Sequence, residues 1–543
     1  MSPMTGRRDL PANAPGRAVL EVLLTAVLFA AAGAWPAPDV NEAVYLTKAR
    51  HQADPAWGRG DFFLETPDAH GIFYLVIGPL AAALPLEQAA WIGRTLGWLA
   101  LAAGFRAAVV PLLGKTSARL TAAAVFSLAV RFTTVAGEWV IGGCEAKVFA
   151  WALVLAAIGA AAAGRFARGW LLAAAGTAFH PVVGGWALVA LLVARLSAPQ
   201  AWGGSPPAGR RGAAALVLIA GLAVAAPGVL PALGLNAGAT AAERAEAATI
   251  YVVERLPHHL LPRTFAGPLV ARHLLAVAVW WLLDRLLPPT GPRRRVAAVA
   301  AAALGISLVG LAISLAEPLA PAAVCGLLRF YWFRLADVVV PFVLAVAAAG
   351  VLGDDVPCRA VFPVRPAIVR GVAAALVAVD LWNQTTHWPL PGRGLAARAD
   401  AAVKAPEWEA VCDWVRDHAP ADAVFLTPRG AASFIWRTGR REVVAWKNSP
   451  QDAASLVAWR RRMTDCFSRD GGMVALERST ADLGVERLRE VAARYGADHA
   501  IVPIDACGAE SLPFERPYEN AAYAVVRIGA GDVVRGPRPA APP

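Results

Sequence analysis

Two carboxylates in a short polar stretch are the first residues whose types could carry chemistry. Asp39 and Glu42 lie in residues 38–46, directly after an apolar run over residues 20–35. A carboxylate at the mouth of a bundle of membrane helices is costly unless water or a partner satisfies it. Such a group could act as a general base on an acceptor hydroxyl. An Asp followed by Glu three residues later is also typical of a capping box, which would only start a helix.

A second charged cluster lies between two apolar runs further along the chain. Glu138, Glu145 and Lys147 are close together in the sequence, and Arg131 precedes them. A turn at the membrane surface, with Trp139 as an aromatic anchor and Glu and Lys paired, explains this pattern without a function. The alternative is that these four charged residues line a polar cavity that binds a substrate.

One histidine and two arginines complete the main candidates. His180 precedes Pro181; a hydrogen-bonded structural histidine is the commoner role there, and a substrate or metal contact is the alternative. Arg329 and Arg334 flank four aromatic residues, which is typical of interfacial anchors. Arginine also makes bidentate contacts with phosphate, so either side chain could hold a phosphate group.

Three weaker patterns are polar and aromatic. They are His258-His259, Trp446-Lys447-Asn448 and Tyr518-Glu519-Asn520. The last two could bind sugar, but strand ends and turns explain them better.

The composition indicates what kind of protein positions these residues. Of the 543 residues, 57% are hydrophobic and 17% are charged, whereas soluble domains carry about 25% charged residues. We therefore predict a polytopic α-helical membrane protein. The net charge of +11 comes from cations in short gaps between apolar runs, which is typical of positive-inside topology. This distribution excludes nucleic acid as a partner and favours membrane lipids.

The apolar runs predict a transmembrane domain over residues 18–382, with about 10–12 membrane helices. A cytoplasmic N-terminus, residues 1–17, precedes an uncleaved first helix, and an acidic outward loop follows at 37–70. Residues 71–86 are short for a span and predict a juxtamembrane segment, with a second span as the alternative. The His180-Pro181 step divides residues 169–195 into two shorter helices. Further spans are predicted at 88–113, 119–137, 145–164, 213–235, 266–284, 296–316, 335–352 and 367–382.

The remainder of the chain has a soluble composition. A linker at 383–399 leads to an α/β domain at 400–532, and residues 533–543 form a disordered tail. Helical patterns at 406–418, 452–464 and 482–495 alternate with strand patterns at 423–426, 442–446, 500–502 and 522–528. The positive-inside count places this domain outside the cytoplasm. An oxidising compartment would allow a disulfide among Cys412, Cys466 and Cys507.

This layout resembles the GT-C class of integral-membrane glycosyltransferases, which includes protein mannosyltransferases and aminoarabinose transferases. In that class the first outer loop has an acidic pair, an aromatic residue, an Ala-Arg step and a Gly-Asp-Trp turn. The corresponding residues here are Asn41-Glu42, Tyr45, Ala49-Arg50 and Gly60-Asp61-Phe62. The resemblance assigns the catalytic acid to Glu42, with Asp39 as a nearby substitute, because Asn41 stands where the class has its Asp.

The resemblance implies that a sugar is transferred from a polyprenyl-phosphate donor to an acceptor on the outer face of the inner (plasma) membrane. Arg329 or Arg334 would hold the donor phosphate. The sequence contains no Walker A, GxSxG, HExxH or Rossmann motif, which favours a lipid-linked donor over a nucleotide sugar. No cofactor is definite, and a divalent metal remains open. The alternatives are a transporter, a membrane-anchored ligand-binding protein, and an inactive relative of the class.

Overall fold

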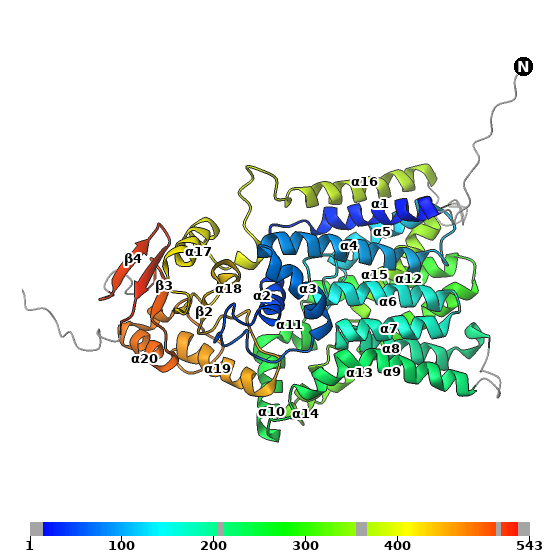
Figure 1. Cartoon of the computed structure of the whole chain (residues 1–543). Coiled ribbons are helices and arrows are strands. Elements are labelled where there is room, and N and C mark those ends of the chain that lie inside the picture. Colours follow the sequence, from blue (N-terminus) through cyan, green and yellow to red (C-terminus); the bar gives the residue numbers. More distant parts are fainter. Residues whose placement is uncertain (1–14, 204–210, 354–365, 507–511, 530–543) are drawn as a thin grey trace, which may run out of the picture.

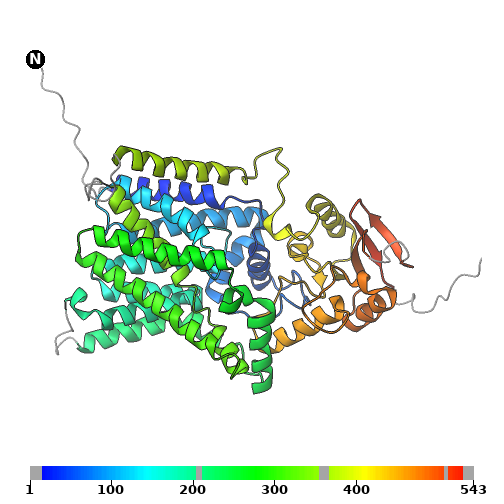
Figure 2. The same ribbon diagram turned by 180° about the vertical axis from the view of Figure 1, so that it is seen from behind.

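The computed structural model describes residues 15–203, 211–353, 366–506 and 512–529. Long helices lie side by side in a bundle, and a small α/β domain lies at one end of this bundle (Figures 1 and 2). Short helices of the outer loops lie between the two parts. The predicted N-terminal segment and C-terminal tail lie mostly or wholly outside the described residues.

The bundle helices match the predicted apolar runs. They are α1 (Pro15–Gly33), α4 (Leu86–Val109), α5 (Thr116–Phe132), α6 (Ala146–Ala162), α7 (Phe166–Phe179), α8 (Pro181–Ser197), α9 (Arg211–Gly234), α12 (Gly267–Leu286), α13 (Gly291–Leu315), α15 (Ala336–Leu352) and α16 (Pro366–Thr385). Three helices among the described residues, α1, α9 and α13, are long and apolar enough to cross a membrane.

Apolar side chains also cover much of the bundle's outside. Leu222 on α9, Leu274 on α12 and Leu308 on α13 are each more than 60% exposed. An apolar surface of this extent is unfavourable in water. Together with the three long apolar helices, it indicates association with a membrane.

Helices α7 and α8 confirm the predicted break at His180. Pro181 is the first residue of α8, where its missing N–H costs no hydrogen bond. The His180 ring nitrogen Nδ1 accepts a hydrogen bond from the Val183 amide at 3.4 Å, so this histidine caps α8. The two helices pack side by side as a hairpin (Figure 1).

The outer segments form short helices at the end of the bundle that faces the α/β domain. Helix α3, in the predicted juxtamembrane segment, has 13 residues and rises about 20 Å, less than the roughly 30 Å of a bilayer core. The others are α2 (Glu42–Ala53), α10 (Ala241–Thr249), the π-helix η3 (Ile250–Arg255), α11 (Pro257–Leu260), the 3-10 turn η4 (Pro262–Thr264) and α14 (Pro321–Leu328). The 3-10 turn η1 (Pro199–Trp202) follows α8 at the opposite end of the bundle, beside the starts of α7 and α13.

The C-terminal α/β domain contains a five-stranded sheet in the order β2-β1-β3-β5-β4. Strand β1 pairs in parallel with β2 and β3, and β5 pairs antiparallel with β3 and β4. Its elements are η6 (Arg398–Asp400), α17 (Ala405–His418), β1 (Val424–Leu426), α18 (Phe434–Thr438), β2 (Arg441–Glu442), α19 (Ala453–Phe467), η7 (Thr480–Leu483), α20 (Val485–Tyr495), β3 (His499–Pro503), β4 (Glu515–Glu519) and β5 (Tyr523–Arg527).

Two details of this domain differ from prediction. Strand β2 has only two residues, since the chain leaves the sheet after Glu442. Edge strand β4 was not predicted because its side chains are half-buried or exposed and lack an apolar alternation.

Cys412 and Cys466 are buried free thiols, so the prediction of a disulfide between these two residues is wrong. Cys507 lies outside the described residues.

The first outer loop packs into the C-terminal domain. Consecutive strand residues face opposite sides of the sheet: Phe425 joins a core with Trp408, whereas Leu426 joins a core with Trp459. Phe63 and Leu64 of the outer loop belong to the first of these cores. The loop therefore connects the α/β domain to the helix bundle by buried apolar contacts as well as by the chain itself.

Candidate functional site

A polar cavity of about 310 Å³ lies where the outer loops meet the C-terminal domain. Carboxylates, cations and tyrosines from distant parts of the sequence converge in it. Its charged and aromatic lining residues are Asp39, Tyr45, Asp68, Glu138, Trp139, Glu145, Lys147, His180, Tyr251, Arg255, His259, Tyr331, Arg334, Arg398 and Lys447. We refer to it as the polar cavity.

Asp39 lines the polar cavity and is held in a fixed orientation. Its Oδ1 accepts from the Val40 amide at 2.7 Å, and its Oδ2 accepts from the Gly143 amide at 3.1 Å. The Arg398 guanidinium lies 3.3 Å from Oδ1. Arg398 belongs to the predicted linker, which folds back on the outer loop through a bond from the Ala399 amide to the Pro38 carbonyl at 3.3 Å. The carboxylate is therefore both positioned and partly neutralised at the wall of the cavity.

Glu42 lies outside the lining of the polar cavity. Its two oxygens accept from Arg94 Nε at 2.7 Å and Nη2 at 2.5 Å, and both side chains are fully buried. The amides of Cys144 and Asp39 each donate to the same carboxylate at 2.7 Å. Four donors thus occupy its two oxygens. This geometry favours a structural role for Glu42, and its role as a base stays a prediction.

Only half of the capping box considered as an alternative is present: the Asp39 amide donates to Glu42, but the Asp39 side chain accepts from the Val40 and Gly143 amides. Asn41, not Asp39, is the N-cap residue of α2. The Asn41 amide nitrogen Nδ2 instead donates to Glu145 at 3.0 Å. The polar loop is therefore ordered by contacts with the segment before α6 and with α4, in addition to the local bond between Asp39 and Glu42.

The predicted cluster at residues 138–147 contributes two ion pairs to the polar cavity. Glu138 pairs with Arg334 at 3.0 Å, and its other oxygen accepts from Trp151 Nε1 at 3.0 Å. Glu145 pairs with Lys147 at 3.2 Å. Glu138, Glu145 and Lys147 therefore line the cavity, as the second alternative proposed, whereas Arg131 does not. Each of the two carboxylates already has a cationic partner.

Histidines and Asp68 form another wall. The rings of His180 and His70 are 4.9 Å apart, and His70 Nδ1 lies 2.6 Å from Asp68. Burial raises the pKa of Asp68, but His70 and the nearby Lys48 outweigh it and hold the pKa at about 2. Burial lowers the pKa of His259 to about 3. A neutral His259 can donate its Nδ1 proton to the Ala136 carbonyl.

Lys447 and Arg255 were missed as cavity residues. Lys447 comes from the C-terminal domain, and Arg255 from the π-helix η3. Burial, followed by repulsion from Arg255, lowers the pKa of Lys447 to about 8. The Trp446-Lys447-Asn448 pattern was the only sequence signal for Lys447, and Arg255 had none, because both depend on contacts between distant segments.

Two predicted residues lie away from the polar cavity. Arg131 pairs with Asp380 at 3.2 Å and lines an adjoining cavity of about 230 Å³, which shares Glu138 and Arg398 with the polar cavity. Arg329 ends α14, where it is half-buried and outside the lining of both cavities. Of the two arginines considered for phosphate, the structure therefore brings only Arg334 to the site.

A metal site is not evident in the described part of the chain, where no group of three or more His, Cys, Asp or Glu side chains could hold an ion. The acidic residues of the polar cavity are instead engaged by cations and amides. The lining has five cationic side chains of Lys and Arg and four carboxylates, so the arrangement suits an anionic ligand bound beside Asp39.

One family model matches part of the chain. It is described as a domain of unknown function, DUF6798, and it covers residues 406–466. This segment runs from α17 to α19 and includes Lys447. No curated protein matches the chain.

Proposed function

We propose that the chain is a polytopic membrane glycosyltransferase of the GT-C type, which transfers a sugar from a polyprenyl-phosphate donor to an acceptor on the outer face of the inner membrane. The supporting observation is the composition of the polar cavity: Asp39 stands in one chamber with five cations, Lys147, Arg255, Arg334, Arg398 and Lys447. A base and a phosphate-binding surface are the two elements that this transfer requires.

The proposed orientation follows from charge and shape. The polar cavity lies at the end of the bundle that carries the C-terminal domain. Cations at the opposite end, in the gaps between helices, favour that end as cytoplasmic. In this topology about 10–12 helices lie in the membrane, and the α/β domain covers the cavity from the outside.

In the proposed reaction the carboxylate of Asp39 removes the proton of the acceptor hydroxyl. The acceptor oxygen forms a bond to the anomeric carbon, and the bond from that carbon to the phosphate oxygen breaks. The electron pair leaves with the polyprenyl phosphate, whose negative charge Arg334, Arg255 and Lys447 stabilise. Arg398, 3.3 Å from Asp39 Oδ1, holds this carboxylate in position beside the acceptor.

The test compares turnover of polyprenyl-phosphate sugars in membranes that contain the wild type, Asp39→Asn or Asp54→Asn at matched expression. Asp54 is a carboxylate of the same outer loop outside the cavity and serves as the control. General-base loss should lower turnover by about 10²-fold or more in Asp39→Asn. Turnover that survives Asp39→Asn would remove the base assignment.

A second candidate is a binding protein derived from the same class. Asn41 stands where the class has its catalytic Asp, and its side chain is engaged with Glu145. In that case the wild type would bind a labelled polyprenyl-phosphate sugar without turning it over. Arg334→Gln would weaken the binding in either case, so turnover by the wild type is the measurement that separates the two candidates.

A further inference from the structure

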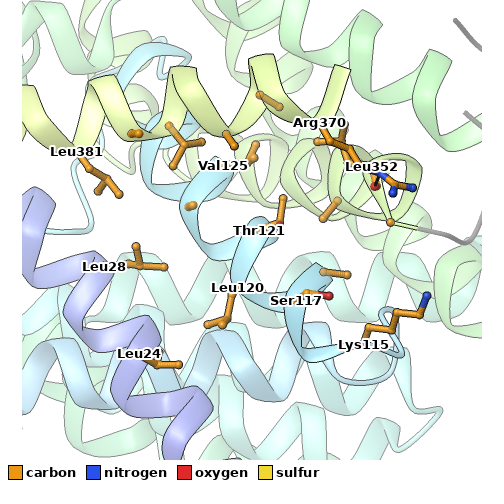
Figure 3. Close-up of a pocket in the computed structure, with 18 of the residues that line it drawn as sticks. Leu24, Leu28, Lys115, Ser117, Leu120, Thr121, Val125, Leu352, Arg370 and Leu381 are labelled. Carbon is orange, nitrogen blue, oxygen red and sulfur yellow. Dashed lines mark hydrogen bonds between the residues drawn. The ribbon is translucent and has the colours of Figure 1, made fainter. Parts of the chain in front are cut away.

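A lateral groove of about 720 Å³ runs between α1, α5 and α16 and ends beside the last residues of α15. Its walls are apolar; Leu24 and Leu28 of α1, Leu120 and Val125 of α5, and Leu381 of α16 point into it (Figure 3). Alanines on α16, among them Ala374 and Ala378, leave the space open because they lack bulk. This groove is separate from the polar cavity and shares none of its lining residues.

Helix α16 is fastened to the bundle at both ends of the groove. Arg370 Nε donates to the Leu352 carbonyl at 2.8 Å near the start of the helix. Beyond its other end, Trp388 Nε1 donates to the Ala31 carbonyl at 3.0 Å. Between these points α16 contacts α1 and α5 in places, and Asp380 pairs with Arg131 of α5, but an apolar space remains open between the three helices. A ligand that filled the groove would therefore connect α16 to the bundle along its middle.

The groove has cations at one end only. Lys115 and Arg370 lie on opposite sides of the groove at that end, where Ser117 also lies, whereas the Leu28 and Leu381 end is apolar (Figure 3). Figure 1 shows that the start of α16 is at the end of the bundle far from the C-terminal domain. The charged end of the groove is thus opposite to the polar cavity.

A buried arginine cluster adds positive charge at the same end. Glu21 of α1 accepts from Arg106 at 2.9 Å and from Arg119 at 3.1 Å, and Arg17 lies 3.9 Å away. One carboxylate therefore faces three guanidinium groups. The Thr116 hydroxyl donates to Glu21, and Thr116 follows Lys115 directly in the chain. Fixed charges of one sign raise the local concentration of an oppositely charged ligand.

We propose that the lateral groove binds a membrane phospholipid with an anionic headgroup. The headgroup phosphate lies between Lys115 and Arg370, and one acyl chain extends between α1, α5 and α16 towards Leu381. Residues 370–381 rise about 17 Å along the helix, which suits an acyl chain lying parallel to it. In the topology proposed above, the charged end faces the cytoplasmic leaflet, where anionic lipids attract basic residues.

The position of the cations along the groove distinguishes this phospholipid from the proposed sugar donor. A polyprenyl-phosphate sugar must bring its phosphate to the polar cavity, at the Arg334 end of the molecule. The lateral groove instead has its cations at the far end, so a donor whose tail lay in the groove would hold its phosphate far from Lys115 and Arg370. The inference rests on the groove and its charges and does not require the proposed transfer.

The test measures lipid binding by the purified full-length protein in detergent. Native mass spectrometry and thermal unfolding are followed as phosphatidylglycerol or phosphatidylcholine with the same acyl chains is added. Phosphatidylglycerol should bind more tightly and raise the unfolding temperature more. The double variant Lys115→Gln/Arg370→Gln should bind it about 20-fold more weakly, and the control Arg165→Gln/Arg168→Gln, at the same end but outside the groove, should bind as the wild type does.

A second variant tests the acyl-chain site without changing charge. Ala378→Trp fills the groove and should abolish the phosphatidylglycerol effect, whereas Ala375→Trp, on the same helix outside the lining, should preserve it. Equal binding of the two lipids, or an unchanged effect in the charge variant, would overturn the proposal. Displacement of phosphatidylglycerol by polyprenyl phosphate would also overturn it, because the groove would then be a donor site.

Discussion

At the scale of single residues, two neighbouring carboxylates have opposite environments. Asp39 and Glu42 are three positions apart, and the sequence alone does not distinguish their roles. Asp39 reaches the polar cavity, where Arg398 is its charged partner. Glu42 turns into the bundle, where Arg94 holds it in a fully buried ion pair. Removing one partner of such a pair strongly destabilises the fold, because the other charge is left buried without compensation.

We therefore expect Glu42→Gln to destabilise the fold rather than only the chemistry. The loss should be about 3–5 kcal/mol, seen as a large fall in unfolding temperature in detergent and in yield of folded protein. Glu87→Gln, an exposed carboxylate on α4, is the matched control and should behave as the wild type. A Glu42→Gln protein with normal stability and no turnover would make Glu42 catalytic after all.

At the scale of elements, small residues allow the bundle helices to approach closely. A Cβ atom added at Gly104 of α4 would lie 2.1 Å from the carbonyl oxygen of Ala152 on α6. A Cβ atom at Gly159 of α6 would lie 2.1 Å from the Ala107 carbonyl oxygen. Both obstacles are backbone atoms and cannot rotate away. Close contact through small residues is the common way in which helices associate in membranes.

Gly104→Ala should consequently separate α4 from α6, although alanine favours helix more than glycine does. Overpacking of this kind costs about 1–3 kcal/mol, which should appear as a lower unfolding temperature. The control is Gly305→Ala on α13, where an added Cβ meets no atom within 4 Å; it should preserve stability. If both variants kept wild-type stability, the α4–α6 contact would be looser than described.

At the scale of the whole molecule, the outer loop and the C-terminal domain are connected by a buried acidic contact. Asp61 Oδ2 accepts from the Glu442 amide at 3.0 Å. The Glu442 carboxyl accepts hydrogen bonds from Asn448 Nδ2 at 2.5 Å and from the Thr427 hydroxyl at 3.1 Å. Burial, and then the Asp61 charge, raise the pKa of Glu442 to about 8. The two parts of the molecule therefore meet at a carboxyl group that favours its neutral form.

This contact should make stability depend on pH. A Glu that binds its proton more tightly when folded contributes stability below pH 4.5, its ordinary pKa, and loses it as the pH rises to about 8. The free energy of unfolding should fall by up to about 1.4 kcal/mol per pH unit in that window. Glu442→Gln, which stays neutral, should remove this slope and be more stable than the wild type at pH 8. Identical slopes for both proteins between pH 5 and 8 would contradict the assignment.

Local patterns in the sequence predicted most of the elements. Each apolar run predicted as a single span became a bundle helix, because length and apolar character act within one segment. Proline ended α7 at His180 because its ring acts on adjacent residues. The alternating patterns after residue 400 predicted β1, β3 and β5 for the same reason. Edge strand β4 was not predicted, because its side chains do not alternate between apolar and polar. Its position is determined by its pairing with β5.

The sequence by itself determined a helical, membrane-associated protein with an α/β domain and a polar stretch near residue 39. Only the tertiary structure decided which charged groups meet. Asp39 and Glu42 could be distinguished only once Arg94 and Arg398 were in place. Lys447 and Arg255 reached the polar cavity through packing between segments that are hundreds of residues apart. The physical reason is that helix formation depends on neighbours in the chain, whereas the partner of a buried charge depends on neighbours in space.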